Sequence, residues 1–376
     1  VGTCVHYLDI GAELADKGIA ALVPLIEETI HTLAPKIIVS DSFRALHDLS
    51  DSKEEMRRML HRLTGMLTAF ETTVFLIGEY TDEQARTMPE FAIADGIVQF
   101  MRKLESNRDE RFVRVLKLRG SGYLEGFHAC KITSKGLDIF PRLITPEFPE
   151  NYLLKQERLK SGIVGLDEVL GGGLLRGSST LVTGPTGAGK TTLALQFAIA
   201  GVLTGDGNSL VLNFQENPTQ LARSINHLTG KDEIPKGLEL MYMSPVEMQI
   251  DSVIVTLFNR IQQEKIGRVV VDAIGDLAMA ASDPDRLHDY LYALTQHFAV
   301  RGISSILTFE TAGSNSATSV HMSRLVYMSD SIIQLDLRRE NDKKKKRYIE
   351  CVKARGTKHD LDPHEFEISE HGLIVR

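Results

Sequence analysis

One glycine-rich run carries the residue types that bind phosphate. It reads Gly184-Pro185-Thr186-Gly187-Ala188-Gly189-Lys190-Thr191, fits the pattern G-x-x-x-x-G-K-[ST], and is followed by Thr192. Glycines let backbone N–H groups turn toward a phosphate, and the N-terminus of a following helix adds positive potential. Lys190 would place a charge on the outer phosphates, and Thr191 would offer a hydroxyl to Mg²⁺. The run therefore predicts a Walker A loop for ATP, with Gly184, Thr186, Gly187, Ala188, Gly189, Lys190, Thr191 and Thr192 as the binding residues.

Two further apolar runs end in residues that could complete such a site. Asp272 follows three valines, and it could hold the water shell of Mg²⁺; the alternative is an aspartate that caps a turn. Gln215 and Glu216 follow another apolar run, and the carboxyl ends of parallel strands face the ligand. Glu216 could polarise a water near the γ-phosphate, or it could instead cap a helix that begins near Pro218. Gln215 can orient a water but cannot accept a proton.

Strand and helix patterns alternate along the chain around these residues. Residues 180–183 form a short strand before the glycine-rich run, and residues 192–198 begin a helix after it. Helical stripes recur, and their apolar positions are Met56, Leu60, Leu63, Leu67 and Phe70, and later Leu287, Leu291, Leu294 and Phe298. This alternation predicts an α/β fold with a mostly parallel sheet.

The chain contains an internal repeat. The segment that ends in Asp41 recurs as the segment that ends in Asp272, and Lys117-Leu118-Arg119-Gly120 recurs as Lys353-Ala354-Arg355-Gly356. The counterpart of Lys190 would fall before residue 1, so the first copy lacks its phosphate-binding part and one central strand. We expect a first domain at residues 1–140, a proline-rich linker at 141–158, and a second, complete domain at 159–376.

Composition narrows the classes of protein. The chain has 376 residues, and 43 basic against 50 acidic residues give a net charge of −7, which argues against a protein that coats nucleic acid. Its three cysteines follow no metal-ligand spacing and indicate reduced thiols in a cytoplasmic protein. No apolar run is long enough to span a membrane. The basic run at residues 343–347 is interpreted as a solvated hairpin tip, with a nucleic-acid contact as the alternative.

These motifs together resemble the KaiC family of RecA-superfamily ATPases. Residues 161–174 are similar to the opening signature of the family's domains, and residues 353–359 match a later family motif. The resemblance implies two tandem RecA-like P-loop domains, six chains stacked as a homohexameric double ring, and ATP between neighbouring subunits. It also implies that Lys353, Arg355 and His359, with Gly356 and Thr357, reach the nucleotide of the adjacent subunit. The family's acidic pair is Glu-Glu, whereas this chain has Gln215 and Glu216.

Three functional hypotheses follow. The first is a KaiC-like ATPase that hydrolyses Mg·ATP slowly, with Lys190, Gln215 and Glu216 in catalysis. Protein Ser/Thr phosphotransfer would be a further activity, and nucleotide state would control an unidentified signalling partner. The Ser-Thr pair that a clock-type autokinase cycle needs is absent, although Ser323 and Ser329 lie nearby. The second is a recombinase- or helicase-type ATPase that handles DNA. The third is a scaffold that binds ATP without turnover.

Overall fold

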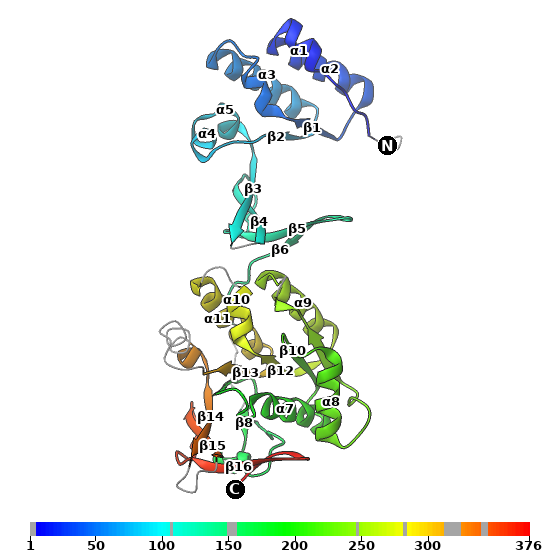
Figure 1. Ribbon diagram of the computed structural model, residues 1–376. Coiled ribbons are helices and arrows are strands. Elements are labelled where there is room, and N and C mark those ends of the chain that lie inside the picture. The colour runs from blue at the N-terminus through cyan, green and yellow to red at the C-terminus, as the bar shows by residue number, and fades with distance from the viewer. Residues whose placement is uncertain are drawn as a thin grey trace. The chain divides into compact units, whose positions relative to one another are not determined.

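The computed structural model describes residues 5–105, 108–148, 156–245, 248–280, 284–311, 325–339 and 345–376 (Figure 1). Contacts divide the chain into two compact units. The first unit comprises residues 1–99 and 114–125, and the second comprises residues 100–113 and 126–376.

The first unit contains a two-stranded parallel sheet with helices packed on one face. Strands β1 (Ile37–Asp41) and β2 (Thr73–Ile77) alternate between exposed and partly buried residues. The helices are α1 (Gly11–Lys17), η1 (Ile19–Ala21), α2 (Leu22–Leu33), η2 (Phe43–His47), α3 (Lys53–Ala69), α4 (Asp82–Thr87) and α5 (Pro89–Ile93). The predicted stripe lies on α3, where Met56, Leu60 and Leu63 are buried. Phe70 departs from it, because it lies beyond the helix end and is 37% exposed.

A four-stranded sheet has the order β3-β4-β5-β6, with β5 antiparallel to both β4 and β6. Its strands are β3 (Gly96–Glu105), β4 (Arg108–Leu118), β5 (His128–Thr133) and β6 (Gly136–Phe140). Within the second unit, the guanidinium of Arg286 lies 5.1 Å from the ring centre of Phe112. His297 Nε2 lies 2.9 Å from the Ile144 carbonyl oxygen. The last strands of the first copy and the start of the predicted linker thus contact helices of the second copy.

The second unit is built on a nine-stranded sheet with the order β11-β10-β12-β13-β9-β14-β15-β16-β17. The parallel strands are β9 (Ser179–Gly184), β10 (Asn208–Asn213), β11 (Leu238–Tyr242), β12 (Ile266–Asp272), β13 (Ser304–Glu310) and β14 (Ser331–Arg339). The antiparallel strands are β15 (Lys345–Ala354), β16 (His364–Ser369) and β17 (Gly372–Val375). A separate small sheet pairs β7 (Arg158–Leu159) with β8 (Leu174–Leu175).

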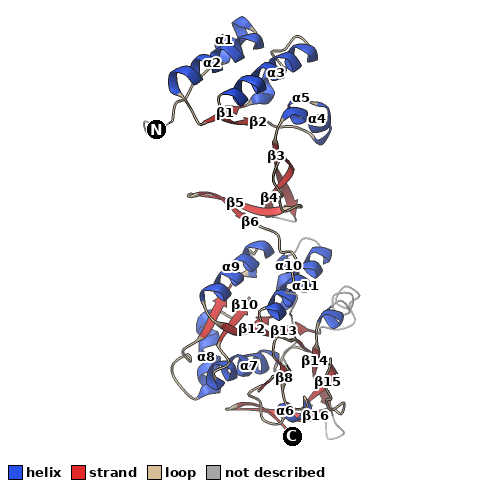
Figure 2. Cartoon of the chain, turned by 180° about the vertical axis from the view of Figure 1, so that it is seen from behind, coloured by secondary structure: helices blue, strands red, loops and turns tan. Residues whose placement is uncertain are grey.

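Helices cover both faces of this sheet (Figure 2). They are α6 (Leu166–Val169), α7 (Lys190–Thr204), α8 (Pro218–Thr229), α9 (Ile250–Gln263), α10 (Ile274–Ala280) and α11 (Pro284–Val300). Val270 packs with α7 and α8, whereas its neighbours Val269 and Val271 pack with α9, α10 and α11. The predicted stripe from Leu287 to Phe298 is buried in that second cluster. The predicted α/β fold with a mostly parallel sheet is confirmed. No described helix is long and apolar enough to cross a membrane.

The two copies share strand register. In the first copy Ile37 pairs with Thr73, and in the second copy Arg268 pairs with Ser304. The sequence separation between Ile37 and Arg268 equals that between Thr73 and Ser304, so equivalent residues are paired in the two copies. The antiparallel strands agree in the same way. There the pair Arg111 and Cys130 of β4 and β5 corresponds to Arg347 and Phe366 of β15 and β16.

The copies differ at one strand. In the second copy β9 pairs with both β13 and β14 and joins them into one sheet. Among the described residues of the first copy no strand has this position, and β2 and β3 belong to separate sheets. Val39 is consequently 57% exposed, whereas its counterpart Val270, which packs with α7, is fully buried. The sequence predicts this missing central strand.

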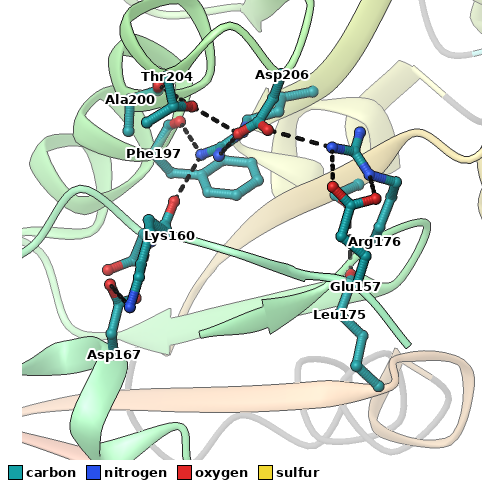
Figure 3. Close-up of polar contacts among 12 residues, drawn as sticks. Glu157, Lys160, Asp167, Leu175, Arg176, Phe197, Ala200, Thr204 and Asp206 are labelled. Carbon is teal, nitrogen blue, oxygen red and sulfur yellow. Dashed lines mark hydrogen bonds and ion pairs between the residues drawn. The ribbon is translucent and has the colours of Figure 1, made fainter. Parts of the chain in front are cut away.

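A buried cation fixes α7 against the sheet. Arg268 at the start of β12 is fully buried, and its Nη1 donates to the carbonyls of Lys160 (2.9 Å) and Phe197 (2.8 Å). Its Nη2 pairs with Asp206 at 2.5 Å, and its guanidinium carbon lies 4.5 Å from the Phe197 ring centre. In Figure 3, Lys160, Phe197 and Asp206 lie around one cluster of hydrogen bonds, and Arg176 contacts Asp206 from the other side. Burial lowers the pKa of Arg268, and Asp206 opposes that shift.

Candidate nucleotide-binding site

The glycine-rich loop lies where a buried strand ends and a helix begins. Strand β9 ends at Gly184, and α7 begins at Lys190 with Gly189 as its N-cap residue. Gly187 and Gly189 have φ angles of 79° and 109°, a backbone conformation that glycine adopts without the steric cost of a side chain. The first turn of α7 is Lys190, Thr191 and Thr192, whose N–H groups precede the first intrahelical bond. Strand, loop and helix therefore lie as the sequence predicts, with the positive end of α7 at the loop.

Lys190 bends back over the loop that precedes it. Its Nζ donates to the carbonyl oxygens of Gly184 (2.9 Å) and Pro185 (3.0 Å). Partial burial lowers the pKa of Lys190, and the charges of Glu310 and Asp272 oppose that shift. A phosphate would offer this ammonium charged oxygens in place of neutral carbonyls, and such charge-assisted hydrogen bonds are stronger.

Asp272 joins the end of β12 to the start of α7. Its Oδ2 accepts hydrogen bonds from the Thr191 hydroxyl (2.8 Å) and from the Asn213 amide (3.2 Å). Its Oδ1 accepts from the Thr308 hydroxyl of β13. The carboxylate is thus held by hydrogen bonds from three elements and directed at the first turn of α7.

The oxygens at this point fit Mg²⁺. The ion prefers hard oxygen ligands and usually keeps several of its waters. Thr191 supplies a hydroxyl, and Asp272 supplies a carboxylate already oriented by neutral donors. These two residues would hold the ion.

Asn213 is a site residue that the sequence reasoning missed. It is the last residue of β10 and is 1% exposed. Its Oδ1 accepts from the backbone N–H groups of Gln215 (3.0 Å) and Glu216 (2.7 Å), while its Nδ2 donates to Asp272. Asn213 therefore links Asp272 to the backbone of the Gln215-Glu216 pair. The available signal was an amide at the end of an apolar strand.

The two side chains of the pair have different surroundings. Gln215 Nε2 donates to both carboxylate oxygens of Asp276, at 3.2 and 3.1 Å. Partial burial and the charge of Asp272 raise the pKa of Glu216, and its Oε2 is buried without a hydrogen-bond partner. The alternative that Glu216 caps a helix is wrong, because Asn217 is the N-cap residue of α8. A half-buried carboxylate with a raised pKa is suited to accept a proton.

Glu310 is a second residue that the sequence reasoning missed at this site. It ends β13, where it pairs with Gly184 of the neighbouring strand, and its carboxylate accepts a hydrogen bond from the Thr186 hydroxyl. The parallel pairing of β13 with β9 brings this acid to the loop. No local pattern in the sequence indicates that pairing.

Lys353 and Arg355 contact carbonyls of their own chain. Lys353 Nζ donates to the carbonyls of Val326 and Ser329, both at 2.7 Å, and Arg355 Nη2 donates to the Tyr327 carbonyl at 2.8 Å. Burial lowers the pKa of Lys353.

The first copy repeats this arrangement. Lys117 Nζ donates to the Ala92 carbonyl at 3.0 Å, and Arg119 Nη2 donates to the same oxygen at 3.4 Å. The repeated Lys-x-Arg motif thus satisfies carbonyls of α5 in the first copy, and carbonyls of the helical residues 325–328 and of Ser329 in the second.

The remaining residues predicted to reach a neighbouring subunit follow β15. Gly356 has a φ of 67°, and the Thr357 hydroxyl accepts a hydrogen bond from Arg158. His359 Nε2 is buried without a hydrogen-bond partner. In the basic run, Lys343 and Lys344 lie outside the described residues, and Lys346 pairs with Glu365 at 3.1 Å. No group of three or more metal-ligating side chains occurs within the described ranges.

Comparison with known proteins identifies the family. A family model described as "ATPase: KaiC" matches residues 8–144 and 159–376, which is nearly the whole chain. The chain belongs to the KaiC ATPase family. It is 29% identical over 376 residues to the circadian clock oscillator protein KaiC of Acaryochloris marina, covering 97% of this chain and 70% of that protein. It is 27% identical over 373 residues to the KaiC of Synechococcus elongatus, covering 95% of this chain and 69% of that protein.

Membership of the KaiC family confirms the predicted fold class and indicates a site that binds ATP. The parallel sheet with helices on both faces is the RecA-like fold that the resemblance implied. As a KaiC-family ATPase, the chain carries an ATP-binding P-loop domain.

Proposed function

We propose that residues 159–376 bind Mg·ATP on the loop from Gly184 to Thr192 and hydrolyse it with Glu216 as the general base. The observation that carries this proposal is the hydrogen bond between Thr191 and Asp272, which joins the phosphate-binding helix to the metal-site acid. Asn213 extends the same network to Glu216.

Each residue has a defined part in the reaction. The N–H groups of the first turn of α7 and the ammonium of Lys190 bind the phosphates. Mg²⁺ held by Thr191 and Asp272 would neutralise charge on the phosphate oxygens. Glu216 takes one proton from a water as the water oxygen bonds to the γ-phosphorus and the bond to the β-phosphate oxygen breaks. The products are ADP and phosphate.

The domain organisation belongs to the same proposal: residues 1–140, a linker at 141–158, and residues 159–376. The shared strand register supports it, and so does the break between the two matched segments, which falls at 145–158. The glycine-rich run lies in the second copy, so we propose the nucleotide site there.

We further propose self-association as a homohexameric ring in the cytoplasm, with Lys353, Arg355 and His359 facing the nucleotide of a neighbouring subunit. The match of residues 353–359 to the family motif supports this, although His359 would have to turn outward, because its Nε2 is buried within its own chain. Lys353 would have to exchange its two carbonyl bonds for a phosphate.

Hydrolysis, rather than phosphotransfer to Ser329, is the activity we propose. The Ser329 side chain is 1% exposed and its hydroxyl donates to the Leu325 carbonyl, so it is closed to a phosphoryl donor. Ser323 lies outside the described residues. Nucleotide-dependent binding of a signalling partner is the proposed outcome of turnover.

The test is ATP turnover by the purified chain, with products resolved by chromatography and incorporated phosphate measured by intact mass. Glu216→Gln should lower kcat by about 10²–10⁴-fold while mant-ADP binding is kept, because only proton transfer is lost. Lys190→Ala should abolish mant-ADP binding. Glu370→Gln makes the same chemical change on an exposed turn and should leave both measurements unchanged.

Other outcomes would replace this function. Unchanged turnover in Glu216→Gln would remove its role as the base. ATP binding with no turnover would establish the scaffold hypothesis. Labelled protein would establish phosphotransfer, and stimulation by single-stranded DNA would favour the recombinase or helicase hypothesis.

A further inference from the structure

Gln215 and Asp276 form a hydrogen-bonded pair beside the proposed reaction site, in which Asp276 is buried and Gln215 is exposed. The Asp276 side chain lies on the first turn of α10, the helix that follows Asp272, and the residue is 8% exposed. Both of its carboxylate oxygens accept from the single amide nitrogen of Gln215. The pair therefore connects the loop after β10 to the helix after β12.

This contact fixes which end of the Gln215 amide faces the helix. An ionised carboxylate can only accept hydrogen bonds, so the amide nitrogen must face Asp276 and the carbonyl oxygen Oε1 must face away. The backbone of Gln215 is fixed independently through Asn213. Oε1 is consequently an acceptor that faces away from Asp276 on an exposed side chain, where a water can reach it.

Charge explains why an amide suits this position. A glutamate at position 215 that kept this contact would place a second carboxylate within about 3 Å of Asp276, where the two like charges repel and favour protonation of one of them. Gln215 instead gives Asp276 a donor.

We infer that Asp276 is a positioning residue for ATP hydrolysis: it holds Gln215 so that Oε1 accepts a hydrogen bond from the attacking water, while Glu216 receives the proton. This inference rests on the proposed function. Gln215 has an acceptor that a water can use, and Asp276 acts only through Gln215.

Four chains test the inference: the unaltered protein, Asp276→Asn, Gln215→Glu, and the double variant. Asp276→Asn lets the Gln215 amide turn either way, so kcat should fall about tenfold with the KM for ATP within about twofold. Gln215→Glu should lower kcat by a similar factor and add an ionisation to its pH profile. In the double variant the amide introduced at position 276 can donate to the carboxylate introduced at position 215. There kcat should recover about tenfold over Gln215→Glu, and the extra ionisation should disappear.

The result that would overturn the inference is additivity, in which Asp276→Asn lowers kcat as much in the Gln215→Glu background as in the unaltered chain. Far-UV circular dichroism and thermal midpoints show whether each variant is folded, and Asp289→Asn on the exposed face of α11 is the matched control. A loss of stability alone would not produce recovery in the double variant.

Failure of the proposed function has a different signature. If Lys190→Ala retains turnover, the phosphate-site assignment fails. If Lys190→Ala abolishes turnover while Asp276→Asn leaves kcat and its pH profile unchanged, only the inference fails. Nucleotide binding without turnover in the unaltered chain would also overturn it.

Discussion

Replacing the buried guanidinium of Arg268 should strongly destabilise the second unit. Arg268→Met removes two hydrogen bonds to backbone carbonyls, at about 1 kcal/mol each, and one to a carboxylate, at about 2 kcal/mol. We therefore expect the free energy of unfolding to fall by about 4 kcal/mol, within the range of 3–5 kcal/mol for breaking a buried ion pair. The methionine side chain fills much of the space of the arginine, so the decrease in the free energy of unfolding measures the lost polar contacts rather than the cost of a cavity.

The assay is urea unfolding followed by far-UV circular dichroism, with no nucleotide present. Arg176→Met is the comparison variant: Arg176 also pairs with Asp206, at 3.2 Å, and its side chain is 14% exposed against 0% for Arg268, while its other partner Glu157 is 55% exposed. The pair with Glu157 is open to solvent, and exposed pairs contribute about 0–1 kcal/mol; with the partly buried pair to Asp206 added, the comparison variant should lose about 2 kcal/mol. Equal losses in the two variants, or less than 1 kcal/mol for Arg268→Met, would refute the reasoning that burial sets the magnitude.

Three further predictions concern the site. The raised pKa of Glu216 means that this base stays protonated to a higher pH than an ordinary glutamate. As the pH is lowered, turnover should therefore begin to fall above the ordinary glutamate pKa of 4.5. A kcat–pH profile of Glu216→Gln should lack this acidic fall. Glu310→Gln removes a negative charge beside the loop and should tighten mant-ADP binding about three- to tenfold, checked by fluorescence titration; a weaker complex would contradict this. Asn213→Ala removes the acceptor of two backbone N–H groups, so the fold-decrease in kcat should exceed the fold-decrease in nucleotide affinity. Turnover and fluorescence titration measure the two quantities, and equal fold-decreases would argue against the role of Asn213.

Local patterns were sufficient for much of the fold and part of the site. The glycine-rich loop could be predicted because its residues are consecutive, and so could the alternation of strands and helices. Asp272 could be predicted because a buried strand precedes it directly. The repeat predicted the missing central strand of the first copy, since matching segments imply matching positions in the sheet.

Residues whose role depends on strand pairing could not be predicted in this way. Asn213, Asp276 and Glu310 meet the site only because β10, β12 and β13 lie side by side and in parallel. The partners of Arg268 lie 62, 71 and 108 residues from it in the chain. The hydrogen bonds of Lys353 to nearby carbonyls could not be predicted from the sequence pattern either.

The position of β9 has a consequence for how the protein is made. This strand pairs with β13 and β14, and its Ser179 N–H is bonded to Asp330, 151 residues later. Pairings over such long separations cost loop-closure entropy and form slowly. During synthesis from the N-terminus, the phosphate-binding loop therefore leaves the ribosome long before the strands that flank β9. Competence to bind nucleotide should be among the last properties the nascent chain acquires, and ATP would then favour completed molecules over partly folded ones.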